Sequence, residues 1–85
     1  MWGRWTAGIL AAQIDDTITW PVAVSGTLRF VASPGINSET LDATMRSAQT
    51  IVNHGRPKAT GIDMTVHCLT QTGYGRFVDW VLFVI

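Results

Sequence analysis

The chain has little charge and no strongly basic segment. Only 14% of its residues are charged, and six basic and six acidic side chains give a formal net charge of zero, whereas an average soluble protein has roughly 25% charged residues. Binding to nucleic acid depends on clustered Lys and Arg, and the largest basic cluster here is Arg56-Pro57-Lys58. We therefore expect no nucleic-acid partner. Weak self-repulsion in such a chain favours association instead.

Cysteine and histidine are also scarce. Cys68 is the only cysteine, so a disulfide within the chain is excluded. With His54 and His67 it forms neither a CxxC nor an HxxxH spacing, and we predict no metal site and no cofactor. A single cysteine and the lack of a convincing signal peptide indicate a soluble, cytoplasmic protein. No run of about 18 apolar residues is present, so we predict no membrane span.

The length predicts one domain, residues 1–85. A domain near this size buries only about 60% of the surface that its unfolded chain exposes, and its core is marginal unless something is added. Disulfides, metals and oligomerisation are the usual additions. Because the first two are not expected, we predict a homo-oligomer, either a dimer or a larger assembly.

Alternation of apolar and polar residues predicts several strands. Residues 17–24, 27–33 and 60–69 alternate, and 75–85 is a further strand that stops alternating after Asp79. Ser25-Gly26 and Thr72-Gly73-Tyr74 are typical of hairpin turns. Ser33-Pro34-Gly35 is expected to end the third segment. Residues 4–13 fit either a strand or a short helix.

A helix is predicted between these strands. Asn37 or Ser38 is the expected N-cap and Gly55 the expected end, with an apolar stripe of Leu41, Met45, Ala48, Ile51 and Val52. The expected fold is α+β, in the order strand, strand, strand, helix, strand, strand. It is a mainly antiparallel five-stranded sheet with the helix packed on one face.

The final strand is apolar on both faces. The side chains of Val78, Trp80, Leu82 and Val84 point to one side, and those of Val81, Phe83 and Ile85 to the other. We assign the first set to the surface beneath the helix. The second set has no cover within a chain of this size, so a second copy or a small apolar ligand is expected to cover it.

Pairing of the last two strands in one hairpin predicts a polar patch. Opposed residues share a face, which sets His67 opposite Asp79 and Thr65 opposite Val81, with Asp63 two residues along. An aspartate opposite a histidine can orient the imidazole as a general base. The same pattern is also typical of a solvated strand face or of polar contacts at a subunit interface.

Exposed aromatic and arginine side chains are further candidates for an interface. Trp2 and Trp5 lie near the start of the sequence, and Tyr74 and Arg76 lie beside the last turn. We expect a small oligomeric binding module that assembles through its C-terminal strand. The alternative is a small enzyme or ligand-binding protein with a pocket between subunits around His67, Asp79 and Asp63. The sequence does not decide whether the protein is an enzyme.

Overall fold

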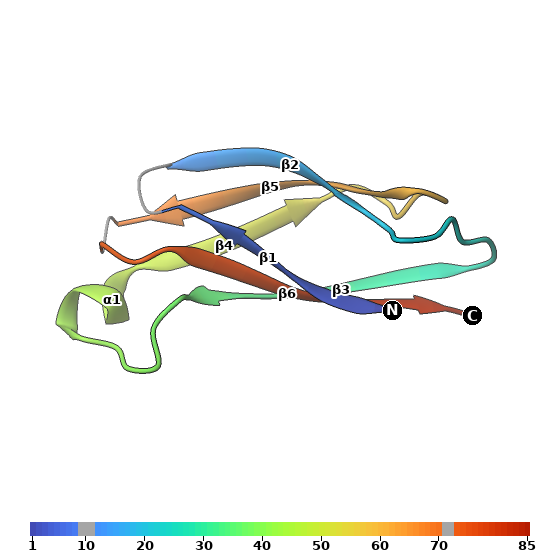
Figure 1. The fold of residues 1–85 in the computed structure, drawn as a ribbon. Coiled ribbons are helices and arrows are strands. Elements are labelled where there is room, and N and C mark those ends of the chain that lie inside the picture. Colours follow the sequence, from blue (N-terminus) through green and yellow to red (C-terminus); the bar gives the residue numbers. More distant parts are fainter. Residues whose placement is uncertain (9–11, 71–72) are drawn as a thin grey trace.

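Two three-stranded antiparallel sheets face each other in the computed structural model, which describes residues 1–8, 12–70 and 73–85 (Figure 1). In sheet A, β6 (Arg76–Val84) lies between β1 (Trp2–Ala7) and β3 (Leu28–Ile36). In sheet B, β5 (Gly61–Leu69) lies between β2 (Gln13–Thr19) and β4 (Gln49–His54). A short helix, α1 (Ala43–Ser47), precedes β4. Among the strands of the described residues, only β4 and β5 are consecutive in the sequence and belong to one sheet, while other consecutive strands belong to different sheets.

The core fills the space between the two sheets. It consists of even-numbered residues whose side chains point inward from both sheets: Ile18, Trp20, Ile62, Met64, Val66, Cys68, Val78, Trp80 and Leu82. The rings of Trp20 and Trp80 lie 5.2 Å apart between centroids. The Trp20 indole also donates a hydrogen bond from Nε1 to the Lys58 carbonyl at 2.9 Å, so its polar end is satisfied inside the core.

The predicted single sheet is wrong. β5 and β6 are not paired with each other, because β5 pairs with β2 and β4 while β6 pairs with β1 and β3. Both strands bury most of their even-numbered residues by facing each other across the sandwich, but Val84, which was assigned to the buried set, is 49% exposed. Ser25-Gly26 likewise forms no hairpin, since β2 and β3 belong to different sheets. Thr72 of the other predicted turn lies outside the described residues.

The predicted long helix is also wrong. Helix α1 covers only Ala43–Ser47, and its N-cap is Asp42, which accepts a hydrogen bond from the Met45 amide at 2.8 Å. The following residues form β4 instead. β-Branched side chains lose rotamer freedom in a helix and pack well in a sheet. The run Thr50-Ile51-Val52 therefore favours the strand, although the same residues fit a helical stripe.

The expected strands 60–69 and 75–85 are confirmed as β5 and β6. In the first segment, Trp2–Ala7 is a strand, while residues 9–11 lie outside the described part. The third strand continues through Pro34 instead of ending there. Thr27 and Ile85 exchange two backbone hydrogen bonds, so the odd-numbered residues of β3 bond to β6. The nitrogen of Pro34 therefore faces away from the sheet, where no donor is needed.

Arg76 joins the two sheets at one end of the sandwich. Its side chain is 3% exposed, so the expectation of an exposed interface arginine is wrong. Nη1 donates to the Gln49 carbonyl and to Thr50 Oγ1, both at 2.8 Å. Nη2 donates to the carbonyls of Leu69 at 3.2 Å and Thr70 at 2.5 Å. The planar guanidinium thus binds backbone oxygens of β4 and of the end of β5 from its place on β6.

Replacing Arg76→Met is expected to destabilise the protein strongly. The variant leaves the partly buried carbonyl groups of Gln49, Leu69 and Thr70 without these donors, which is expected to cost about 1–3 kcal/mol of unfolding free energy. Urea denaturation followed by tryptophan fluorescence measures this loss. Arg46→Met is the matched control because Arg46 is exposed on α1, and its effect should stay within about 0.5 kcal/mol. Equal stability of the two variants would contradict this role of the Arg76 hydrogen bonds.

Candidate functional site

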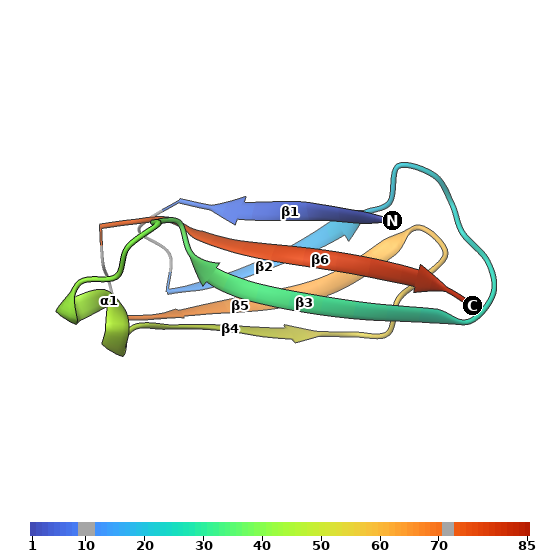
Figure 2. The same ribbon diagram turned by 90° about the horizontal axis from the view of Figure 1, so that it is seen from below.

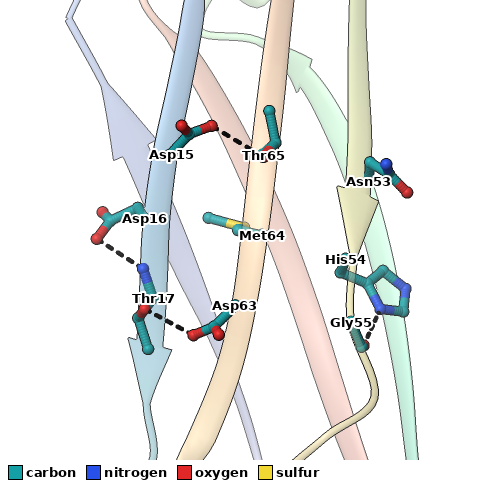
Figure 3. Close-up of a pocket in the computed structure, with 9 residues that line it drawn as sticks. All are labelled: Asp15, Asp16, Thr17, Asn53, His54, Gly55, Asp63, Met64 and Thr65. Carbon is teal, nitrogen blue, oxygen red and sulfur yellow. Dashed lines mark hydrogen bonds between the residues drawn. The ribbon is translucent and has the colours of Figure 1, made fainter.

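The outer face of sheet B carries a group of polar side chains. Asp15, Thr17, Asp63 and Thr65 point outward from β2 and β5 and line a shallow depression of about 660 Å³ (Figure 3). Thr65 Oγ1 donates to Asp15 Oδ1 at 2.9 Å, and Thr17 Oγ1 donates to Asp63 Oδ1 at the same distance. These are cross-strand pairs in register, since Asp15 lies opposite Thr65 and Thr17 opposite Asp63.

The carboxylates of this face are bound by neighbours within the chain. Asp63 also accepts a hydrogen bond from Lys58 Nζ at 3.1 Å, and the hydrogen bond from Thr17, followed by that from Lys58, lowers the pKa of its carboxyl. Among the described residues, no three His, Cys, Asp or Glu side chains come together as a metal-binding group. The carboxylates of this face are therefore satisfied by hydrogen bonds from neighbouring side chains.

The predicted pairing of His67 with Asp79 is wrong. His67 lies on the outer face of sheet B, opposite Gln13 and Ile51. Asp79 lies on the outer face of sheet A, on the other side of the sandwich. Asp63 and Thr65 share the face of His67, as predicted, but Asp79 is not among them. The alternative built on a His67, Asp79 and Asp63 pocket therefore loses its geometric basis.

Asp79 is bound by Arg4 of the neighbouring strand β1. Arg4 Nε donates to Oδ1 at 2.6 Å and Nη2 donates to Oδ2 at 2.9 Å, a bidentate arrangement. The guanidinium also lies over the Phe77 ring, 4.3 Å from its centroid. These contacts neutralise the charges at the middle of the outer face of sheet A.

The rest of that outer face is mostly apolar and exposed, although Arg29 lies opposite Phe83 on the same face. In the strand register, Val81 lies between Trp2 of β1 and Val31 of β3. Trp2 is 81% exposed, Val31 54% and Phe83 52%, while Val81 is half-buried. Ile85 is 79% exposed beyond the end of β6. We call this set, Trp2, Val31, Val81, Phe83 and Ile85, the apolar patch.

Trp5 and Tyr74, which the sequence analysis grouped with Trp2, lie elsewhere. Trp5 is half-buried and packs against the core. Its Nε1 donates to Asp16 Oδ2 at 2.7 Å, while Asp16 Oδ1 accepts the Thr17 amide at 2.8 Å. Asp16 thus joins the edge strands β1 and β2 of the two sheets. Tyr74 is exposed next to β6, but it is not part of the apolar patch.

Acid is expected to weaken the fold through the carboxylates on the two sheets. Hydrogen bonds from Trp5 to Asp16 and from Arg4 to Asp79 lower the pKa of each carboxyl. A depressed folded-state pKa contributes stability above the unfolded value of about 3.9, and this contribution is lost as the pH falls through the folded value. Urea unfolding across acidic pH should show a shallower decline for the double variant Asp16→Asn, Asp79→Asn. An equal loss of unfolding free energy with falling pH in the wild type and the double variant would show that these two carboxylates do not cause the acid sensitivity.

Neither Arg4 nor Asp16 was identified from the sequence. Both act across strands that are distant along the chain or belong to different sheets, and the only sequence signal was an acidic pair, Asp15-Asp16, which is typical of a turn.

No helix in the described part of the chain is long and apolar enough to span a membrane. No protein-family model, curated protein or solved structure matches the chain.

Proposed function

We propose that the protein is a self-associating interaction module, in which two copies stack the outer faces of their A sheets. The observation that carries this proposal is the apolar patch on a sheet face that no other element of the described chain covers. Sheets pack face to face about 10 Å apart through interdigitated apolar side chains. The other face of sheet A already makes such a contact with sheet B inside the molecule.

The charges on the face favour a second copy as the partner. Arg4 and Asp79 neutralise each other within one chain, so two identical faces meet without an unpaired charge at their centre. Arg29, opposite Phe83 on the edge strand, is the remaining charge at the outward positions of sheet A, so a strongly charged partner finds little complementary charge there. The zero net charge of the chain also keeps long-range repulsion between copies small.

The size of the face indicates a weak dimer. Three strands spaced about 4.8 Å apart make the face roughly 14 Å wide. The central strand has nine residues and rises about 3.4 Å per residue, which makes the face roughly 30 Å long. This flat area of about 400 Å² compares with about 800 Å² of accessible surface buried per partner in a standard interface. We therefore expect dissociation in the micromolar range or weaker.

A charge placed in the apolar patch is expected to prevent association. Phe83→Lys buries an unpaired ammonium group in the dimer and should raise the dissociation constant at least about tenfold. The monomer should remain folded because Phe83 is more than half exposed. Sedimentation velocity over a concentration series measures the monomer–dimer equilibrium.

Ile51→Lys provides the matched control for this experiment. Ile51 is 45% exposed, but it lies on the outer face of sheet B. Its replacement adds the same charge to the opposite side of the molecule and should leave the equilibrium unchanged. A wild-type protein that stays monomeric at millimolar concentration would contradict the proposal, as would equal effects of the two variants.

A further inference from the structure

A groove runs between the free edge of β3 and the segment that follows β4. The two strands lie beside each other along one side of the sandwich, and the chain after β4 turns back near the start of β3 (Figure 2). The groove has a volume of about 610 Å³. Small-ligand sites typically occupy roughly 300–1,000 Å³, so this groove has the size of a site for a small molecule.

The floor of the groove is apolar and partly aromatic. Leu28, Phe30 and Pro57 line it, and each is half-buried. The His54 ring meets Phe30 edge to face, with 4.9 Å between centroids. Phe30 also stacks on Trp80 of the core at 6.2 Å, which fixes the position of its ring. A flat apolar group would find a rigid surface here.

The rim of the groove is positively charged. Arg29 and Arg56 both line it, and no aspartate or glutamate does. The two ion pairs of the described residues use other cations, Arg4 and Lys58. Arg29 makes one long hydrogen bond, from Nη1 to the Leu28 carbonyl at 3.5 Å, beyond the usual range of about 2.7–3.2 Å. Most of its donors therefore remain open to an anion.

Backbone donors of β3 also face the groove. Odd-numbered residues of β3 and its flanks form the backbone hydrogen bonds to β6. Thr27 exchanges two such bonds with Ile85, and the Asn37 amide donates to the Gly75 carbonyl at 2.9 Å. The amides of Leu28 and Phe30 consequently point away from β6 at the open edge. Amides beside guanidinium groups are the donors that bind carboxylate and phosphate oxygens.

We propose that this groove binds a small organic anion, in which a carboxylate or a phosphate is joined to a flat apolar group. The anionic group would be held by Arg29, Arg56 and the free amides of β3, and the apolar group would pack on Phe30 and Pro57. The proposal does not depend on self-association, because the groove lies along the side of the sandwich, and Arg29, which lies opposite Phe83, is the lining residue that it shares with the outer face of sheet A.

The test is titration of isotope-labelled protein with benzoate and with phenyl phosphate, followed by amide NMR shifts. We expect saturable shifts at Leu28, Phe30 and Gly55 with at least one probe, and the probe that binds identifies the anionic group. Benzyl alcohol, which has the ring without the charge, should bind at least about tenfold more weakly. Inorganic phosphate, which has the charge without the ring, should also bind at least about tenfold more weakly.

The double variant Arg29→Gln, Arg56→Gln is expected to weaken binding of the anionic probe by about tenfold or more, since charge-assisted hydrogen bonds are lost. Arg46→Gln removes one exposed arginine on α1, outside the groove, and should bind like the wild type. Unchanged spectra elsewhere in the molecule will show that each variant is folded.

Each of these results would overturn the proposal: no saturable binding of either anionic probe, equal binding by the double variant, or equal binding of benzyl alcohol. Inorganic phosphate binding as tightly as phenyl phosphate would also refute it, because the apolar floor would then contribute nothing. A protein that is monomeric and still binds a probe would contradict the proposed assembly and support the groove.

Discussion

The contact between β5 and β6 is the constraint on which the structure depends. Each is the central strand of its sheet, and their even-numbered side chains meet in the middle of the sandwich. Ile62, Val66 and Val78 are 0% exposed and Leu82 is 1% exposed. Burial of such side chains contributes about 1.5–3 kcal/mol each. The other four strands extend these two on either side, and Arg76 fastens one end of the contact with backbone hydrogen bonds.

The alternation in the sequence placed these two strands and identified most of their buried residues, although Val84 is 49% exposed and Arg76, which was expected to be exposed, is buried. It could not tell whether the strands pair within one sheet or face each other in two, because both arrangements bury the same even-numbered residues. The predicted His67 and Asp79 site depended on the first arrangement and is lost in the second. The long helix was predicted because Leu41, Met45, Ala48, Ile51 and Val52 fit a helical stripe, while the β-branched run 50–52 was underweighted.

The polar groups of the two outer faces are paired in different ways. On sheet B, Asp15 and Asp63 are paired with hydroxyl groups across the strands, so this face can remain in water. On sheet A, the ion pair of Arg4 and Asp79 lies among mostly apolar side chains, and Arg29 lies beside Phe83 on the edge strand. The side groove differs from both faces, because Arg29 and Arg56 reach it from separate segments of the chain. Its composition could not be predicted without knowing that β3 and β4 lie at adjacent edges.

The crossing connections have a consequence for the order of folding. β1 and β3 bond to no other strand than β6 in the described structure, and Arg4 is separated from Asp79 by 75 positions. Sheet A therefore cannot begin to form on the ribosome until the β6 segment has been synthesised. β4 and β5 are the one pair that can form locally, as a hairpin. Since distant pairings must overcome loop-closure entropy first, we expect slow folding that starts from this hairpin.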